Sequence, residues 1–213
     1  MNDPHADQPL LHFGADVATA RLVAIMLHGR GAGAEDILGL ASEFSAPGVA
    51  YLAPQAAGRT WYPYSFLTPT DRNQPFLDSA LRRIETLIAM LHDQQIPPTR
   101  ICLMGFSQGA CLALEFAARH AQRYAVIAGF SGGVIGPPGT ARHYAGTFDG
   151  TPVFLGCSDV DPHIPVERVH ETGEVFAKMG ARVDKHIYPQ MPHTIIKAEI
   201  DAVDALLAPA ATS

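Results

Sequence analysis

Short, almost continuously apolar runs alternate along the chain with longer stretches in which apolar residues recur at helical spacing. Continuous apolar runs are typical of strands that are buried on both faces of a parallel sheet. The predicted strands are residues 22–27, 49–53, 100–106, 124–130, 152–156 and 183–188. The longer stretches predict helices, because their apolar residues would share one face. The predicted helices are residues 34–44, 74–95, 108–119, 165–179 and 194–207.

This alternation predicts an α/β fold with a mostly parallel central sheet and helices on both of its faces. We expect residues 1–213 to form a single domain, with loose ends at about 1–9 and 209–213. Two long stretches do not fit the alternation: one is irregular and aromatic, and the other is rich in Gly and Pro. They are residues 55–72 and 131–150. Long ordered loops in a compact domain are often functional.

Composition argues against several classes of function. The 213 residues are 47% hydrophobic and 17% charged, as in a globular protein, and the net charge of −6 argues against nucleic-acid binding. No apolar run approaches the roughly 20 residues of a membrane span, and the acidic start of the chain is unlike a signal peptide. The three cysteines form no disulfide framework. We therefore expect a cytoplasmic protein without integral membrane association.

The sequence GFSQG places Ser107 between an apolar strand and a helix. A sharp turn in this setting holds a serine hydroxyl exposed at the end of a strand. A hydroxyl needs a base, usually a histidine oriented by a carboxylate, before it can act as a nucleophile. It also needs hydrogen-bond donors for the oxyanion that develops.

The loops after the other predicted strands supply candidates for these groups, because the carboxyl ends of parallel strands share one edge of the sheet. The sequence LHGRGA follows the first strand and offers the backbone N–H of Arg30, with the N–H of Gln108 as its partner donor. The sequence CSDVDPHIP offers two carboxylates, Asp159 and Asp161, and these residues alone leave the choice open. His193 follows the last strand. A chain order of serine, aspartate and histidine is that of the α/β-hydrolases.

Taken together, LHGRGA, GFSQGA, DPHIP and MPHT resemble the phospholipase/carboxylesterase family of α/β-hydrolases, over nearly the whole chain. The resemblance implies that Ser107 is the nucleophile, Asp161 the triad aspartate and His193 the triad histidine. It also implies an oxyanion hole formed by the backbone N–H groups of Arg30 and Gln108. The segments TWYPYSF and DPHIPVERV look closer to the bacterial carboxylesterases than to the related acyl-protein thioesterases.

We therefore expect a serine hydrolase that cleaves small carboxylic esters without a metal or other cofactor, with thioesters as a further candidate substrate. Short to medium acyl chains would lie in an apolar pocket. The residues expected to line that pocket are Trp61, Tyr62, Phe66 and His163. Two alternatives stay open: a lysophospholipase or acyl-protein thioesterase, and a non-catalytic receptor that binds a small ester. The pattern is compatible with a monomer or a homodimer.

Overall fold

The computed structural model describes residues 3–210, and within them seven strands form one sheet in the order β1-β3-β2-β4-β5-β6-β7. β1 pairs with β3 in antiparallel fashion, and every other pair is parallel. The bounds are β1 Leu10–Gly14, β2 Leu22–Leu27, β3 Val49–Pro54, β4 Ile101–Phe106, β5 Val126–Phe130, β6 Pro152–Ser158 and β7 Arg182–Tyr188. The predicted parallel sheet is therefore confirmed.

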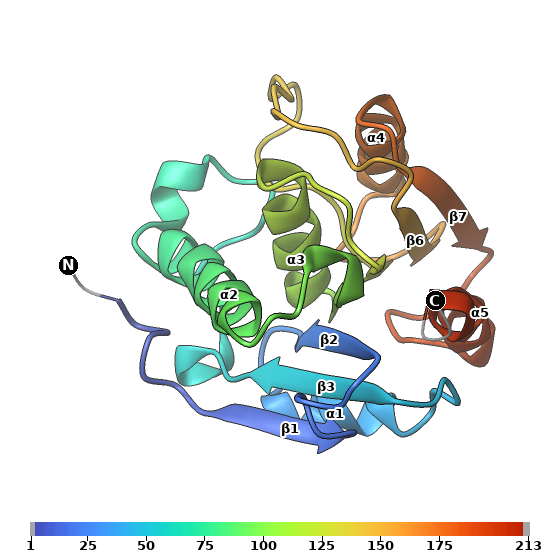
Figure 1. Ribbon diagram of the computed structural model, residues 1–213. Helices are drawn as coiled ribbons and strands as arrows, with labels where there is room; N and C mark the ends of the chain where they lie inside the picture. The colour runs from blue at the N-terminus through green and yellow to red at the C-terminus, as the bar shows by residue number, and fades with distance from the viewer. Residues whose placement is uncertain (1–2, 211–213) are drawn as a thin grey trace.

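Helices cover both faces of this sheet, as the alternation of apolar runs predicted (Figure 1). Their bounds are α1 Ala34–Ala41, α2 Phe76–Asp93, α3 Gln108–Arg119, α4 Val166–Lys178 and α5 Lys197–Ala210. α2, α3 and α4 pack on one face, and α1 and α5 pack on the other. Within residues 3–210, no helix has the length and apolar character that crossing a membrane requires.

The inner strands β2 to β6 are apolar at almost every position because helices bury both faces of the sheet there. In β2, Val23 and Ile25 pack into the core beneath α2, α3 and α4, whereas Ala24 and Met26 pack beneath α1 and α5. Successive side chains of a strand point to opposite faces, so a strand between two helical layers needs an apolar residue at every position. This explains why the strands lack an alternating polar pattern.

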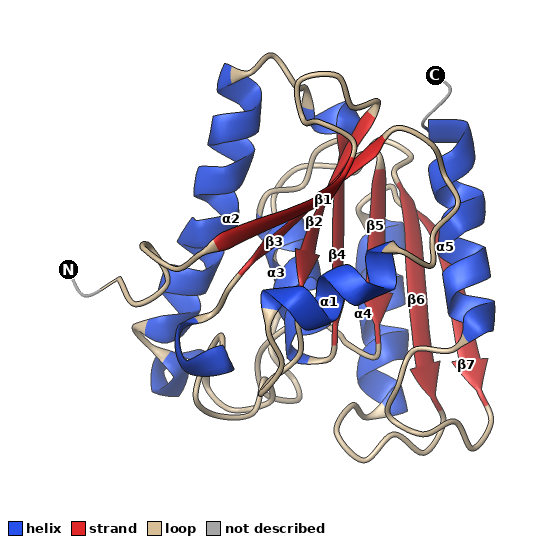
Figure 2. Ribbon diagram, turned by 90° about the horizontal axis from the view of Figure 1, so that it is seen from below, coloured by secondary structure: helices blue, strands red, loops and turns tan. Residues whose placement is uncertain are grey.

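The carboxyl ends of the parallel strands lie together at one edge of the sheet. Figure 2 shows β4, β6 and β7 pointing to this edge, where several loops gather. The loops that follow β2, β4, β6 and β7 carry the candidate residues from four distant parts of the sequence. The fold thus brings to one place the groups that the sequence separates.

The two ends of the chain differ from the loose segments that we expected. His5 is fully buried, and its backbone N–H donates to Ser79 Oγ at 3.0 Å. Its Nδ1 accepts the Ala57 N–H at 3.0 Å, so Nε2 carries the proton and donates to the Trp61 carbonyl oxygen at 2.9 Å. At the other end, α5 continues through residue 210. The remainder of both expected ends, residues 1–2 and 211–213, lies outside the described residues.

Charged side chains hold the long segment 131–150 in place. Glu115 Oε2 accepts the Ile135 N–H at 2.9 Å, and Arg168 Nη1 donates to the Gly136 carbonyl oxygen at 2.7 Å. Gly136 in turn donates its N–H to the Phe66 carbonyl oxygen at 2.8 Å. These bonds connect the segment with the aromatic stretch 55–72, so the two irregular parts of the chain support each other.

Candidate active site

Ser107 occupies the sharp turn between β4 and α3. Its backbone has φ 56° and ψ −118°, a conformation that costs energy for a residue with a side chain. Glycines allow the turn because neighbouring backbones come very close. A Cβ atom on Gly105 would lie 2.4 Å from the Gly109 backbone, and one on Gly109 would lie 2.1 Å from the Leu27 carbonyl oxygen. The strain and the close packing hold the Ser107 hydroxyl at the end of the strand.

His193 connects this hydroxyl with a carboxylate. His193 Nε2 lies 2.9 Å from Ser107 Oγ, and its Nδ1 lies 2.6 Å from Asp161 Oδ2. An ionised carboxylate can only accept, so Nδ1 carries the proton and donates to Asp161. Nε2 is then free to accept the proton of the Ser107 hydroxyl. The structure therefore brings together three side chains, predicted from the sequence, that belong to three separate loops.

Asp161 is held as a carboxylate in a buried position. Its side chain has no exposed area, and its Oδ1 accepts the backbone N–H groups of His163 at 2.8 Å and Ile164 at 3.0 Å. Burial alone would raise the pKa of Asp161, but the hydrogen bonds from His193, His163 and Ile164 outweigh it and lower the pKa below the usual value. Asp161 is therefore ionised at neutral pH and can fix the orientation of His193.

Asp159, the other carboxylate of this loop, lies apart from His193. Its side chain is exposed, and Oδ1 accepts the backbone N–H of Gln190 at 2.8 Å. This bond joins the loop after β6 to the loop that carries His193. The arrangement separates the two aspartates that the sequence left in competition: one contacts the imidazole, and the other connects the two loops.

The two expected oxyanion donors lie beside Ser107. Gln108 is the first residue of α3, where the helix dipole is positive and amides have no helical acceptor. Arg30 lies in the loop after β2 and lines the same cavity as Ser107 and Gln108. In the part of the chain that the structure describes, the backbone N–H groups of Arg30 and Gln108 donate to no protein acceptor in a turn or loop. Both donors can therefore bind an oxygen atom of a ligand.

The Gln108 side chain has a role that the sequence did not indicate. Its Oε1 accepts the Trp61 N–H at 2.9 Å, and its Nε2 donates to the Tyr62 carbonyl oxygen at 2.8 Å. Trp61 Nε1 donates to the His28 carbonyl oxygen at 2.9 Å. These bonds join the aromatic loop to the turn that holds Ser107. No local pattern could have revealed them, because the partners are more than 30 residues apart in the sequence.

Trp61 corrects one of our expectations. We expected it to line the substrate pocket, but it is fully buried in the core and does not line the cavity at Ser107. Its indole ring packs against the His28 ring, with the ring centroids 5.0 Å apart. The indole N–H and the backbone N–H of Trp61 both have acceptors inside the protein. Trp61 therefore packs inside the protein and supports the active-site loops, and it does not contact the substrate cavity.

A cavity of about 490 Å³ opens beside Ser107 and His193. Tyr62, Phe66 and His163 line it, as expected. Arg30 also lines it, and the sequence did not indicate its other wall residues, which include Pro63, Tyr64, Ser65, Phe106, Cys111 and Ile164. The His163 ring lies edge-on to the His193 ring, with the ring centroids 4.8 Å apart. The cavity is thus lined by both apolar and polar side chains.

The Arg30 side chain forms part of this cavity wall. Its Nη1 donates to the Pro63 carbonyl oxygen and its Nη2 to the Tyr64 carbonyl oxygen, both at 2.8 Å. The forked guanidinium thereby fixes two consecutive carbonyls of the aromatic loop. Arg30 joins the loop after β2 to the cavity wall in the same way that Gln108 joins α3 to it.

Comparison with known proteins adds a second line of argument. The family profile described as Phospholipase/Carboxylesterase matches residues 15–209. A solved phospholipase/carboxylesterase from Dyadobacter fermentans is 42% identical, with a TM-score of 0.91 over 94% of this chain and 96% of that one. A carboxylesterase from Bacillus cereus is 16% identical, with a TM-score of 0.72 over 96% and 95% of the two chains. At that identity, the likeness shows only the fold.

Among curated proteins, an acyl-protein thioesterase 1 from Gibberella zeae is 32% identical over 123 residues. The match covers 57% of this chain and 52% of that protein. The chain spans about half the length of the curated relatives it matches.

Proposed function

The chain belongs to the phospholipase/carboxylesterase family and has the α/β-hydrolase fold that its sequence predicted, and from this membership we propose that it cleaves carboxylic esters as a serine hydrolase. The observation that supports the proposal most strongly is the hydrogen-bonded row from Asp161 through His193 to Ser107. We propose that these three residues are the catalytic triad and that the reaction passes through a covalent acyl-enzyme.

In the first step, Ser107 Oγ attacks the carbonyl carbon of the ester, and His193 Nε2 takes the hydroxyl proton. The carboxylate of Asp161 keeps the Nδ1 proton in place and stabilises the imidazolium that forms. His193 then donates its new proton to the alcohol that leaves. In the second step, His193 Nε2 takes a proton from a water molecule, and the water oxygen attacks the acyl carbon. The bond between that carbon and Ser107 Oγ then breaks, and His193 returns the proton to Ser107 Oγ.

The backbone N–H groups of Arg30 and Gln108 are proposed to hold the oxyanion in both steps. Donors that are fixed before the reaction stabilise the developing charge without having to reorganise, and removing one typically costs about 100- to 1000-fold in kcat. The guanidinium of Arg30 and the amide of Gln108 already bond to the aromatic loop. These side-chain bonds support the proposal because they hold both backbone segments in position.

The acyl group is proposed to be short to medium in length and to lie in the cavity beside Ser107. Its volume of about 490 Å³ falls in the range of small-molecule sites, roughly 300–1,000 Å³. The rings of Tyr62 and Phe66 supply apolar wall, and His163 stands next to the proposed base. This combination favours small esters over large ones.

A thioester of an acylated protein is the second candidate substrate, favoured by the 32% identity to an acyl-protein thioesterase. Thioester cleavage would use the same nucleophile, base and oxyanion donors. A lysophospholipid is the third. Rates on p-nitrophenyl esters of increasing chain length, compared with a palmitoylated peptide and a lysophosphatidylcholine, distinguish the three. We expect the highest kcat/KM on the shorter p-nitrophenyl esters.

Labelling with a fluorophosphonate probe tests the proposal directly. Wild type should be labelled on Ser107, and Ser107→Ala should lose both the label and the activity, by about 10⁶-fold in kcat. Ser42→Ala is the matched control, because Ser42 is exposed and its hydroxyl donates to the Gly39 carbonyl oxygen of the adjacent helix α1. A folded Ser107→Ala protein with near-wild-type turnover would refute the assignment. Binding of an ester without labelling or turnover would favour a receptor instead.

A further inference from the structure

We propose that the alcohol portion of the ester lies in a second cavity, next to His193, and that it is small, apolar and uncharged; this rests on the esterase function proposed above. The second cavity has a volume of about 300 Å³. It lies between α1, the loop after β2, the end of β4 and the loop that carries His193, and we call it the alcohol cavity. The cavity of about 490 Å³ beside Ser107 is then the acyl cavity.

The two cavities meet at the reacting residues. Phe106 and His193 line both of them, and the centroids of these two rings lie 4.9 Å apart. Gly29 lines the alcohol cavity, and a Cβ atom on it would lie 3.5 Å from Ser107 Cβ and 3.3 Å from Phe106 Cδ1. The alcohol cavity therefore reaches the turn that holds Ser107. An ester with its carbonyl carbon at Ser107 Oγ can extend into both cavities.

The proposed chemistry assigns one side of the ester to each cavity. Ser107 and both residues of the proposed oxyanion hole, Arg30 and Gln108, line the acyl cavity, and none of the three lines the alcohol cavity. As the bond between the acyl carbon and the alcohol oxygen breaks, His193 Nε2 gives its proton to that oxygen. The alcohol thus departs on the side of His193, whereas the acyl carbonyl stays beside the oxyanion donors.

Apolar side chains form much of the wall of the alcohol cavity. Ile37 and Leu40 belong to α1, and Ile195 lies in the loop that carries His193. Ile37 is buried, and Leu40 and Ile195 are half-buried against the core beneath α1 and α5. An alkyl or aryl group here leaves water, and the free energy gained grows with the apolar area that is buried. The volume is at the lower end of the range of small-molecule sites, roughly 300–1,000 Å³, which suits an alcohol of benzyl size.

The polar part of this wall disfavours an anionic alcohol. His28 is buried, its Nδ1 donates to the Gly29 carbonyl oxygen at 2.8 Å, and its Nε2 accepts the Ala56 N–H at 3.1 Å. Burial lowers the pKa of His28, so its ring is neutral at neutral pH. Asp36 adds a carboxylate to the wall, and among residues 3–210 no lysine or arginine lines the alcohol cavity. An anion would find no cationic side chain of that kind to pair with there.

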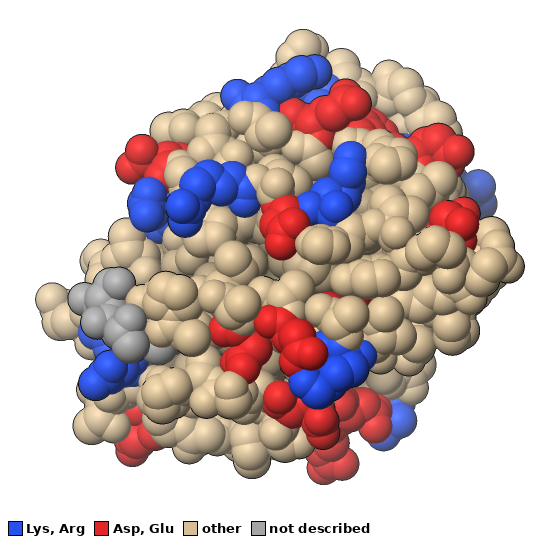
Figure 3. All heavy atoms as spheres, turned by 90° about the vertical axis from the view of Figure 1, so that its right-hand side faces the viewer, with Lys and Arg blue, Asp and Glu red and all other residues tan. Residues whose placement is uncertain are grey.

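The charge of the whole chain points the same way. The sequence carries 21 acidic and 15 basic residues, which gives a net charge of −6. On the face seen in Figure 3, basic groups stand beside acidic ones in several places, so this face has no broad positive field that would attract an anion. The phosphate-bearing head group of a lysophospholipid therefore suits the alcohol cavity less well than an uncharged alcohol does.

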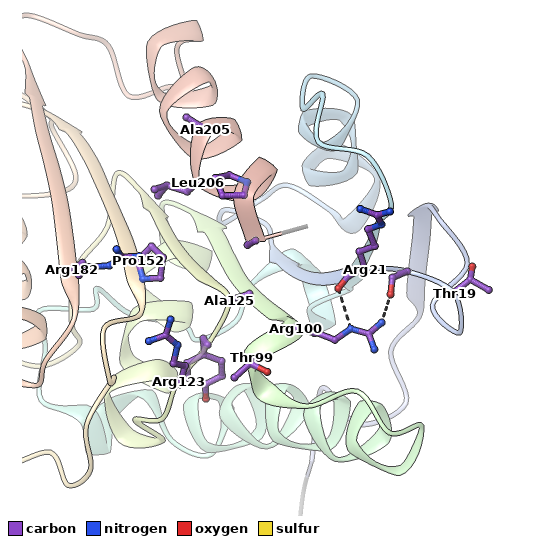
Figure 4. A pocket seen from close by; sticks show the side chains of 14 residues that line it. Thr19, Arg21, Thr99, Arg100, Arg123, Ala125, Pro152, Arg182, Ala205 and Leu206 are labelled. Carbon is purple, nitrogen blue, oxygen red and sulfur yellow. Dashed lines mark hydrogen bonds between the residues drawn. The ribbon is translucent and has the colours of Figure 1, made fainter. Parts of the chain in front are cut away.

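A larger cavity, of about 850 Å³, cannot take the place of the alcohol cavity. It lies at the opposite edge of the sheet, beside the last turns of α5 (Figure 4). Arg100 lines it just before β4 begins, whereas Ser107 follows the last residue of that strand. The six residues of β4 separate the two positions by roughly 20 Å, at about 3.3 Å per residue. No small alcohol bonded to an acyl group at Ser107 spans that distance.

Hydrolysis of three butyrate esters tests the proposal: methyl butyrate, benzyl butyrate and 4-carboxybenzyl butyrate. All three form the same acyl-enzyme and differ only in the alcohol that leaves. We expect kcat/KM, measured by titrating the released acid at constant pH, to be at least about tenfold higher on benzyl butyrate than on methyl butyrate. On 4-carboxybenzyl butyrate it should be at least about tenfold lower than on benzyl butyrate, because burying a carboxylate without a partner is costly.

Leu40→Trp places a bulky ring on the wall of the alcohol cavity. It should lower the ratio of kcat/KM on benzyl butyrate to that on methyl butyrate at least about fivefold. The matched control is Ser42→Trp, which adds the same ring at an exposed position just after α1 and should keep the wild-type ratio within about twofold. An unchanged ratio in a folded Leu40→Trp protein would overturn the proposal. If that variant fails to fold, the three esters on wild type decide alone.

The results also separate this proposal from the esterase function on which it rests. A wild-type protein that cleaves methyl butyrate without favouring benzyl butyrate would overturn the alcohol cavity and leave the esterase function standing. Equal kcat/KM on benzyl and 4-carboxybenzyl butyrate would overturn the preference for an uncharged alcohol. Turnover of none of the three esters would overturn this proposal together with the proposed cleavage of small esters.

Discussion

At the scale of single residues, the candidate site depends on two aspartates that are only two positions apart. Asp161 is buried and accepts hydrogen bonds from an imidazole and two backbone amides, whereas Asp159 is exposed and accepts one from Gln190. The three bonds to Asp161 are what keep its pKa low in spite of burial. Asp161 needs these hydrogen bonds because a buried carboxylate is otherwise protonated, whereas the exposed Asp159 is solvated by water.

Asp161→Asn should lower kcat about 10⁴-fold and leave KM within a few-fold. An amide at this position can donate to Nδ1, and His193 would then present a proton to Ser107 instead of a lone pair; in serine proteases this tautomer change has about that cost. Steady-state kinetics on a p-nitrophenyl ester are the measurement. Asp159→Asn is the control and should lose less than about tenfold. A larger loss in Asp159→Asn would transfer the orienting role to Asp159.

At the scale of elements, patterning predicted β2 to β6, which are buried on two sides, and also β7, several of whose side chains are exposed. β1 was missed because it is a short, partly exposed edge strand, and its antiparallel pairing with β3 depends on a partner more than 30 residues away. Ser107 and His193 could be predicted because each follows a recognisable strand, whereas the choice of Asp161 over Asp159 came from the resemblance to the family. The place of Trp61 could not be predicted, since an aromatic residue in a loop can face either the core or a cavity. The hydrogen bonds of Trp61 to distant residues place its ring in the core.

Gln108→Leu should lower the free energy of unfolding by about 2–4 kcal/mol. The substitution leaves the Trp61 N–H and the Tyr62 carbonyl buried without partners, and each unsatisfied group costs about 1–3 kcal/mol. Urea unfolding followed by circular dichroism gives the value. Gln94→Leu, at an exposed helix end, should change it by less than about 1 kcal/mol. Equal stability of wild type and Gln108→Leu would show that the aromatic loop is held by other contacts.

At the scale of the whole molecule, one buried acid makes the free energy of unfolding depend on pH. Glu199 of α5 is fully buried against β6, and a Cβ atom on Gly156 would lie 2.2 Å from its Oε1. Its Oε2 accepts the Ile196 N–H at 3.0 Å, whereas Oε1 has no hydrogen bond within the described residues. Burial raises the pKa of Glu199 from 4.5 to about 7. Between pH 4.5 and about 7, Glu199 is therefore protonated in the folded protein and ionised in the unfolded chain.

Because the folded state binds this proton more tightly than the unfolded state, the free energy of unfolding falls as the pH rises. The favourable contribution is complete below the unfolded pKa of 4.5 and is lost as the pH passes through about 7, an overall change of about 3 kcal/mol. Glu199→Gln cannot ionise, so its free energy of unfolding relative to wild type should increase by about that amount between pH 4.5 and 8.5. Urea titrations across this range give the curve. Glu174→Gln, at an exposed position on α4, should show a flat difference, and a flat difference for Glu199→Gln would contradict the assignment.

A chain that leaves the ribosome with its amino end first can build this sheet largely in the order of synthesis. After β4 has paired with β2, each of β5, β6 and β7 joins the strand made just before it. The growing edge stays open to other nascent chains until β7 covers it. β7 places Arg182, Asp184 and Lys185 at exposed positions on the final edge, and such charges discourage pairing with another molecule. Because His193 is made only after that strand, the chain acquires a protected edge before it can complete the row to Ser107.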